Sequence, residues 1–203
     1  MSGKPFAENV ITIPTDQSIF EQTFAAYSVV LIGTREADRS MDIAPKHMAT
    51  PLGLSNYFGF VCTPKHHTYQ NIKRTEEFSV SYPRPEEILS ISFSAEDRDE
   101  EGKKPNLDTL ETIPATTIDP EIVKNSYVFL ECRLEEISDR FGDNSFIAGK
   151  IVAQHVHEDV KRSPDRDDNE IINDHPILAY LHPGRYTQIS DSYSFPFPRD
   201  FER

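Results

Sequence analysis

The stretch SYVFLECRLEEI (residues 126–137), followed by SFIAGKIVAQHVH (residues 145–157), decides the fold class. In both segments apolar and polar side chains alternate, as in strands that bury one face. Phe141, Gly142, Asp143 and Asn144 lie between them and predict a turn that joins the two strands. Two long alternating strands joined in this way are typical of a closed β-sheet.

Shorter elements precede this pair, and each is bounded by residues that end regular structure. Strands are predicted over residues 27–34, 41–44, 56–63 and 77–82, the first two forming a hairpin, with Pro64 ending the third. Helices are predicted over residues 67–75, where Thr68 is a candidate cap, and from Pro85 onward. Because strands and helices do not alternate as βαβ units, the pattern predicts a barrel rather than a Rossmann sheet.

The chain of 203 residues is expected to form one domain with additions at both ends. Residues 1–24 are a predicted N-terminal extension, residues 25–189 the domain, and residues 95–106 a charged, solvated loop within it. Residues 190–203 carry aromatics and prolines without periodicity. They predict an extended arm that packs on its own barrel or on a partner subunit, with an unattached tail as the alternative.

Composition limits the classes of partner. The formal net charge is −13, which disfavours nucleic acid and anionic membranes, because both are bound through cationic side chains. A small phosphorylated ligand stays compatible, since one pocket can be positive in a negative field. No signal peptide or membrane-spanning run is expected, so the protein is predicted to be cytoplasmic. Cys62 and Cys132 are interpreted as buried and reduced, with one disulfide as the alternative.

The sequence lacks the motifs of metal sites, hydrolases, NTPases and Rossmann dehydrogenases. His155 and His157 share a face of one strand, but no third ligand stands at a diagnostic spacing, so no metal site is predicted. A Gly-x-Ser-x-Gly elbow, a P-loop and a Gly-x-Gly-x-x-Gly motif are all missing from the sequence. The patterns that remain point away from hydrolases, NTPases and Rossmann dehydrogenases.

Four blocks, in order, resemble the flavin reductase-like family with its FMN-binding split barrel. They are YSVVLIGT (27–34), Asp42-Ile43-Ala44-Pro45, TPKHHTYQN (63–71) with Ile72, and the long strand pair with Leu178-Ala179-Tyr180-Leu181 and Gly184-Arg185-Tyr186. The resemblance spans residues 25–187. It implies a mainly β protein, a six-stranded antiparallel Greek-key split β-barrel with small peripheral helices, and a homodimer with the flavin near the subunit interface.

The resemblance also implies where FMN binds. The backbone leaves a strand through Pro45, so its free amides and carbonyls can face the isoalloxazine ring. The residues implied there are Pro45, Lys46, His47, Met48, Ala49 and Thr50, and Arg185 is implied as a further contact. The residues implied near the phosphate are Thr63, Lys65, His66, His67 and Thr68. A lysine and helix-start amides suit a phosphate. The local pattern alone is equally compatible with a solvated Lys65 and a capping Thr68.

One turn departs from the family pattern. Many members carry Gly-Asp-His there, with the histidine near the nicotinamide, whereas this chain has Gly142-Asp143-Asn144. Asparagine is a nicotinamide-side candidate but does not exchange protons near neutral pH. We expect an FMN-dependent NAD(P)H:flavin oxidoreductase that has no catalytic acid or base of its own, uses NADH or NADPH, and supplies a monooxygenase or another flavin-accepting partner. The alternatives are an FMN-binding electron-transfer or flavin-storage protein without a nicotinamide site, and a flavin-free interaction module.

Overall fold

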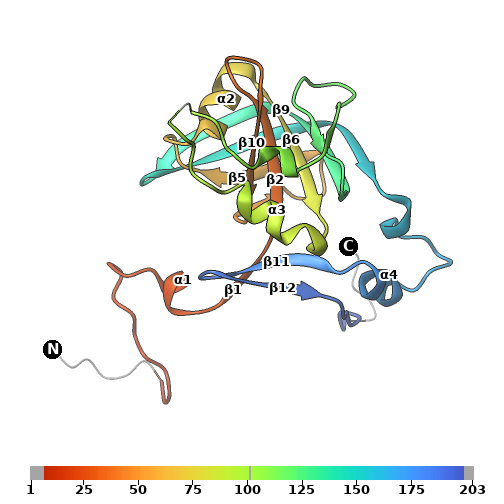
Figure 1. The fold of residues 1–203 in the computed structure, drawn as a ribbon. Helices are drawn as coiled ribbons and strands as arrows, with labels where there is room; N and C mark the ends of the chain where they lie inside the picture. The colour runs from red at the N-terminus through yellow and green to blue at the C-terminus, as the bar shows by residue number, and fades with distance from the viewer. Residues whose placement is uncertain (1–6, 101, 199–203) are drawn as a thin grey trace.

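A computed structural model describes residues 7–100 and 102–198. Its main body is one curled antiparallel sheet with strand order β3-β2-β6-β9-β10-β5-β4 (Figure 1). These strands are β2 (Val30–Arg35), β3 (Met41–Lys46), β4 (Ala49–Pro51), β5 (Tyr57–Cys62), β6 (Glu77–Pro83), β9 (Ser126–Phe141) and β10 (Asn144–Val156). The two edge strands, β3 and β4, are separated in sequence by only His47 and Met48, so the sheet curls until its edges approach each other.

The long strand pair forms as predicted. β9 and β10 are antiparallel neighbours, and Gly142 in the turn between them has a φ of 66°, a conformation that glycine adopts without strain. Six longer strands and the three-residue β4 make the mainly β split barrel expected from the sequence. The predicted strands over residues 41–44, 56–63 and 77–82 correspond to β3, β5 and β6.

Two smaller sheets and short helices complete the structure. A three-stranded sheet contains β1 (Ala25–Ser28), β11 (Ile177–His182) and β12 (Arg185–Ile189), and β7 (Thr112–Ile113) pairs with β8 (Ile122–Val123). The α-helices are α1 (Ile19–Gln22), α2 (His67–Thr75), α3 (Ile88–Phe93) and α4 (Asp168–Asp174). Single 3₁₀ turns occupy Pro85–Glu87, Leu107–Thr109 and Glu158–Val160. The β1-β11-β12 sheet lies below the barrel in Figure 1, and sequence reasoning did not predict it.

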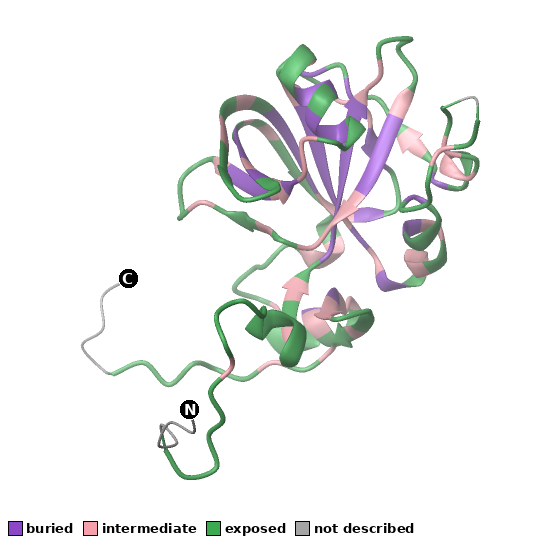
Figure 2. Cartoon of the chain, turned by 90° about the vertical axis from the view of Figure 1, so that its left-hand side faces the viewer, coloured by how far each residue is buried: buried purple, intermediate pink, exposed green. Residues whose placement is uncertain are grey.

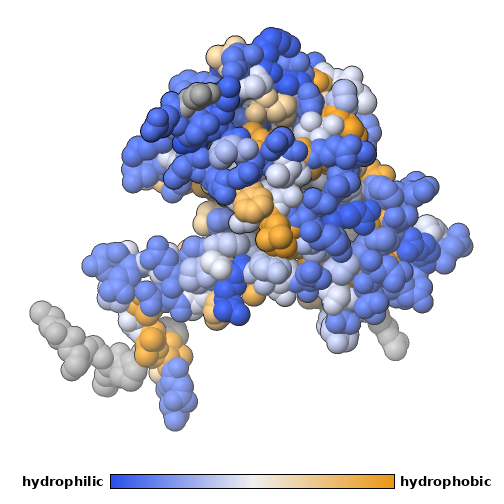
Figure 3. Space-filling view, in the orientation of Figure 1, coloured by the Kyte–Doolittle hydropathy of each residue, from blue (hydrophilic) through white to orange (hydrophobic). Residues whose placement is uncertain are grey.

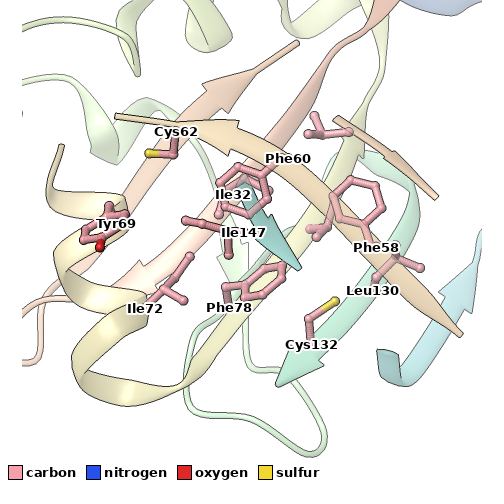
Figure 4. Close-up of a cluster of buried hydrophobic side chains, with 12 residues drawn as sticks. Ile32, Phe58, Phe60, Cys62, Tyr69, Ile72, Phe78, Leu130, Cys132 and Ile147 are labelled. Atoms are coloured by element: carbon pink, nitrogen blue, oxygen red, sulfur yellow. The ribbon is translucent and has the colours of Figure 1, made fainter. Parts of the chain in front are cut away.

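The apolar core fills the inside of the curled sheet. Phe58 and Phe60 from β5, Phe78 from β6 and Ile147 from β10 are fully buried and belong to one cluster with Ile72 of α2 (Figure 4). The ring of Phe78 lies against Gly149, where a Cβ atom would stand 2.5 Å from it, so this strand position accepts only glycine. Buried residues gather in the barrel, whereas the segments leading to both termini are exposed (Figure 2).

The prediction of one strand over residues 27–34 is wrong. β1 pairs with β11, and β2 pairs with β3 and β6, so the run divides at Val29 between two sheets. The apolar pattern continues across Val29 because this residue is itself buried, in a second cluster with Leu31 and Leu178. Burial alone therefore concealed the change of hydrogen-bond partner.

Most of the described residues of the charged loop over residues 95–106 are exposed, as expected for a solvated loop. Arg98 and Lys104 differ from that expectation, because their side chains are largely buried and contact Asp42 on β3, which holds the loop against the barrel. Residues 190–198 contain no helix or strand. Tyr193 is 92% exposed, and Ser192 donates to Asn169 of α4. Residues 1–6, 101 and 199–203 of the predicted segments lie outside the described residues.

Candidate functional site

Two cavities meet at the end of β3. The first, which we call the α2 cavity, has a volume of about 350 Å³ and lies between the start of α2 and the loop after α3. The second, the aromatic cavity, has a volume of about 540 Å³ and lies between α3 and the β11-β12 hairpin. They share Pro45, Lys46 and Ala95, so one elongated ligand can reach both.

Cationic side chains outnumber carboxylates by one in the α2 cavity, although the chain as a whole is acidic. Its charged lining residues are Lys46, Lys65, Arg98, Lys104, Asp42, Glu96 and Asp97, four cations against three carboxylates. Asp42 is 1% exposed, and its carboxylate meets Arg98 Nη2 at 2.7 Å and Lys104 Nζ at 3.1 Å. Because Asp42 is already compensated, Lys46 and Lys65 keep positive charge for a ligand.

The start of α2 forms one wall of the α2 cavity. His66 is the N-cap residue, its side chain caps nothing, and the helix runs to a left-handed Glu76. The first amides of a helix have no intrahelical acceptor, so those of His67 and Thr68 are available to an anion. Burial, followed by the charges of Lys46 and Lys104, lowers the pKa of His66. His66 is therefore neutral at pH 7 and serves a ligand as a hydrogen-bonding group.

The polar side chains within α2 hold the helix in place. Thr68 is buried, and its Oγ1 donates to Asp42 Oδ2 at 3.4 Å, so the interpretation of Thr68 as a helix cap is wrong. Asn71 Nδ2 donates to Thr34 Oγ1 on β2 at 3.1 Å. Tyr69 is buried, and its hydroxyl donates to Asp139 on β9 at 3.1 Å. The wall of the α2 cavity is thus fixed to three strands.

Apolar and aromatic groups line the aromatic cavity. Its walls combine aliphatic residues of α3 with rings of the β11-β12 hairpin, namely Val29, Ile88, Leu89, Ile91, His47, Tyr180 and Tyr186. Lys46 and Arg185 are its charged residues, and no carboxylate occurs among the described residues that line it. Apolar surface is visible in the middle of the face shown in Figure 3, between the barrel and the β11-β12 hairpin. The cavity is suited to a flat, largely apolar ring system.

His47 is the one site residue with an unsatisfied buried atom. Its ring lies 4.4 Å from that of Tyr180 and 5.6 Å from that of Tyr27. Burial, followed by His182 and Lys46, lowers the pKa of His47, so the imidazole is neutral. Its Nε2 is buried and has no hydrogen-bond partner among the described residues. An unpaired buried nitrogen costs free energy, and a bound ligand with a polar edge would remove that cost.

The structure brings together most, but not all, of the predicted site residues. Pro45, Lys46, His47, Lys65, His66, His67, Thr68 and Arg185 line one or both cavities. The predicted residues that line neither cavity are Met48, Ala49, Thr50, Thr63 and Asn144. Met48 belongs to the link between the edge strands, and Asn144 begins β10 at the hairpin turn. Sequence reasoning missed Arg98, Lys104, Tyr180 and Tyr186, of which only the two tyrosines lay within a quoted motif.

Some other groups are accounted for without a ligand. Cys62 and Cys132 are free and buried, as the sequence interpretation expected. His155 Nε2 lies 3.1 Å from Glu131, and His157 contacts Asp159. Within residues 7–100 and 102–198, no group of three or more histidine, cysteine and acidic side chains is arranged to hold a metal ion. Across the same residues, no helix has the length and apolar character needed to cross a bilayer.

The fold and the cavities at the end of β3 define an antiparallel split-barrel protein, and the sequence comparison gives its family. The profile of the flavin reductase-like domain matches residues 23–190, so the chain belongs to this family. The match agrees with the resemblance seen over residues 25–187. A search of curated protein sequences found no significant match.

Solved structures share the fold at low sequence identity. Nitrilotriacetate monooxygenase component B from Bacillus cereus has a TM-score of 0.78 and 16% identity, over 93% of this chain and 100% of its own. Pseudomonas fluorescens 2-nitrobenzoate 2-nitroreductase NbaA has a TM-score of 0.76 and 19% identity, with 91% of each chain covered. An FMN-binding protein from Thermus thermophilus with bound 1-cyclohex-2-enone has a TM-score of 0.72 and 18% identity, over 93% and 99%.

Proposed function

We propose that this chain binds FMN and works as an NAD(P)H:flavin oxidoreductase. The observation that carries the proposal is the contact between two chemically different cavities at Pro45 and Lys46. FMN has the same division, with a dianionic phosphate at one end and a planar, largely apolar ring at the other. Family membership supports the choice of a flavin.

The phosphate is assigned to the α2 cavity. Lys65 supplies a charge at the rim, and the amides of His67 and Thr68 supply directed donors with the favourable end of the helix dipole behind them. Neutral His66 adds a hydrogen-bonding group. Thr63, which follows β5, is proposed to complete this end of the site.

The isoalloxazine ring is assigned to the aromatic cavity. The polar edge of the ring would give the buried Nε2 of His47 the hydrogen-bond partner that it lacks among the described residues. The positive charges of Lys46 and Arg185 would stabilise the negative charge of a reduced flavin. When bound, the flavin supplies hydride acceptance and donation, which no side chain of the protein can supply. The proposed ring contacts also include Met48, Ala49 and Thr50 on the link and on β4.

The protein's role in the reaction is positioning and electrostatics. Hydride transfer between two rings needs them held face to face and needs no protein acid or base. Asn144 lines neither cavity and lies at the β9-β10 turn. Its amide side chain cannot act as an acid. That location favours a second candidate function, an FMN-binding electron-transfer protein without a nicotinamide site of its own.

The visible spectrum of the purified protein with FMN tests these candidates directly. For a reductase we expect bound, oxidised flavin that loses its absorbance when NADH or NADPH is added without oxygen. An electron-transfer protein would keep oxidised flavin with both nucleotides and lose the absorbance only with dithionite. Protein that binds no FMN, in spectrum or in thermal shift, would contradict both candidates and leave a flavin-free module.

We also propose that the chain forms a homodimer and supplies flavin to a partner. Large apolar side chains stand exposed on the N-terminal extension, on β12 and on the arm, namely Phe20, Phe24, Ile189, Tyr193 and Phe195. A homodimer would cover them, and light scattering at micromolar concentration should give twice the mass of 23.2 kDa. Structural likeness to a monooxygenase component supports a flavin-accepting partner. Two free cysteines are consistent with the proposed cytoplasmic location.

A further inference from the structure

His67, the first residue of α2, is bound on one side by a carboxylate. Its Nδ1 lies 3.0 Å from Oε1 and 3.3 Å from Oε2 of Glu36, the residue that follows β2. A carboxylate has no hydrogen to donate, so Nδ1 carries the proton of this hydrogen bond. Glu36 therefore fixes which nitrogen of the neutral His67 ring is protonated.

Glu36 is itself held in place from two directions. Its backbone belongs to the turn between β2 and β3, where its amide donates to the carbonyl of Ser40 at 2.9 Å and its carbonyl accepts from the amide of Arg39 at 3.0 Å. Its side chain is 14% exposed, and Arg98 Nη2 contacts the same Oε1 that faces His67. The carboxylate is thus oriented before any ligand binds.

The second ring nitrogen of His67 remains for a ligand. His67 lines the α2 cavity, its side chain is 53% exposed, and its Nε2 has no hydrogen-bond partner among residues 7–100 and 102–198. In a neutral ring whose Nδ1 carries the proton, Nε2 is an acceptor, and a phosphate dianion has no hydrogen to offer it. Nε2 donates to a phosphate only when the ring carries a second proton. An imidazolium between a carboxylate and a phosphate is stabilised from both sides.

The other histidine at the start of α2 is placed differently. His66 contacts no carboxylate among the described residues, and burial, followed by the charges of Lys46 and Lys104, lowers its pKa. Asp42 is compensated by Arg98 and Lys104. The remaining charged residues that line a cavity together with His67 are Lys65, Glu96, Asp97, Asp38 and Lys103. Because histidine is the side chain that changes its charge near neutral pH, a proton that enters with an anion goes to His67.

We propose that His67 binds the phosphate of FMN as an imidazolium, with Glu36 as its positioning residue, so that FMN binding takes up one proton. The inference rests on the proposed function, which assigns the phosphate to the α2 cavity. The phosphate lies on the Nε2 side of the ring, because Glu36 occupies the space between His67 and Arg98. The proton comes from solvent and adds to Nε2, while Nδ1 keeps its own proton toward Glu36.

Isothermal titration of the full chain at pH 8 with FMN and with riboflavin tests the proton uptake. Each titration is repeated in two buffers that have different heats of ionisation. FMN should take up about one proton and riboflavin none, since riboflavin has no phosphate. The affinity for FMN relative to riboflavin should fall by up to about tenfold between pH 8 and pH 9. The phosphate is already a dianion above pH 7 and adds nothing to this change.

Two variants assign the proton to its residues. His67→Gln keeps a hydrogen-bonding side chain that cannot be protonated, and it should abolish the uptake and its pH dependence. Glu36→Gln removes the carboxylate at constant size and should reduce both. The matched control is His157→Gln, because His157 is a half-exposed histidine paired with a carboxylate, Asp159, that lines neither the α2 cavity nor the aromatic cavity. It should leave the uptake unchanged.

The possible failures are distinguishable. FMN that binds more tightly than riboflavin without proton uptake, or with uptake that persists in His67→Gln, would overturn this inference alone. Uptake that is lost in His67→Gln but complete in Glu36→Gln would overturn the positioning role of Glu36. FMN that binds no more tightly than riboflavin at any pH from 6 to 9 would overturn the phosphate assignment and this inference together.

Discussion

Asp42 on β3 and Glu131 on β9 are both buried carboxylates, but the protein neutralises them in opposite ways. Asp42 is balanced by full charges, since Arg98 and Lys104 both contact it. Glu131 is fully buried and accepts from the amides and hydroxyls of Thr116 and Thr117 at 2.6–2.8 Å, with His155 at 3.1 Å.

The two arrangements do different work. The cations that compensate Asp42 line the α2 cavity beside Lys46 and Lys65, so the ion pairs around this carboxylate are part of the cavity wall. The threonines around Glu131 belong to the segment between β7 and β8 and line neither the α2 cavity nor the aromatic cavity, so this carboxylate holds a loop against the barrel. The carboxylate that is paired with cations, Asp42, therefore belongs to the proposed site. The carboxylate that accepts hydrogen bonds from neutral donors, Glu131, belongs to the scaffold.

Removal of Asp42 should have the largest effect. Asp42→Ala leaves the 10%-exposed Lys104 without its counter-charge, which typically costs about 3–5 kcal/mol of stability. Urea unfolding measures the loss. The double variant Asp42→Asn with Lys104→Met removes both charges and should recover most of it. If the double variant is no more stable than Asp42→Ala, the loss does not come from an uncompensated charge on Lys104.

Substitution of Glu131 should cost less, and its cost should depend on pH. Burial acts to raise the pKa of Glu131, but the hydrogen bonds from Thr117 and Thr116 outweigh it and lower the pKa from 4.5 to about 2. Glu131→Gln replaces one accepting carboxylate oxygen with an NH2 donor that would face the donors of Thr116 or Thr117, and it should cost about 1–3 kcal/mol at pH 7.

The sign of the pH effect follows from the lowered pKa. The ionised carboxylate contributes its full stability above pH 4.5, and that contribution is lost as the pH falls toward 2. The stability difference between the wild-type chain and Glu131→Gln should therefore shrink across this range. A difference that stays constant from pH 6 to pH 3 would contradict the role given to the four donors.

Removal of His155 should have the smallest effect. Its side chain is 40% exposed, and Glu131 keeps four neutral donors without it. His155→Ala should change the free energy of unfolding by no more than about 0.5 kcal/mol. A loss as large as that of Glu131→Gln would mean that the carboxylate depends on an ion pair, as Asp42 does, and would remove the contrast between the two regions.

The same two carboxylates show how far the sequence could be read. Alternation along residues 126–137 predicts β9, and the family resemblance implies that Lys65, His66 and His67 lie near a flavin phosphate. Neither signal predicts that Arg98 and Lys104 return to Asp42, because those partners are 56 and 62 positions away and lie in a segment with no periodicity. Likewise, the sequence does not distinguish Glu131 from the other glutamates of its strand. Its role is visible only when the structure places Thr116 and Thr117 beside it.

The division at Val29 was unpredictable for a related reason. Hydrophobic pattern reports burial, and Val29 and the first five residues of β2 are all buried, although β1 itself is not. What changes is the strand with which the backbone pairs, and pairing is decided by β11 at the other end of the chain. Local sequence therefore predicted most strands of the barrel, whereas the pairing of β1 with β11 and the contacts between distant segments required the structure.

The central claim is that the α2 cavity binds the phosphate of a flavin, and titration of the chain with FMN and with riboflavin tests it most directly. The two ligands differ only by the phosphate. FMN should bind more tightly by about a hundredfold, and Lys65→Ala should reduce FMN affinity about tenfold while leaving riboflavin unaffected. Lys150→Ala, at an exposed position on β10, is the matched control and should change neither. Equal affinities for FMN and riboflavin would contradict the assignment.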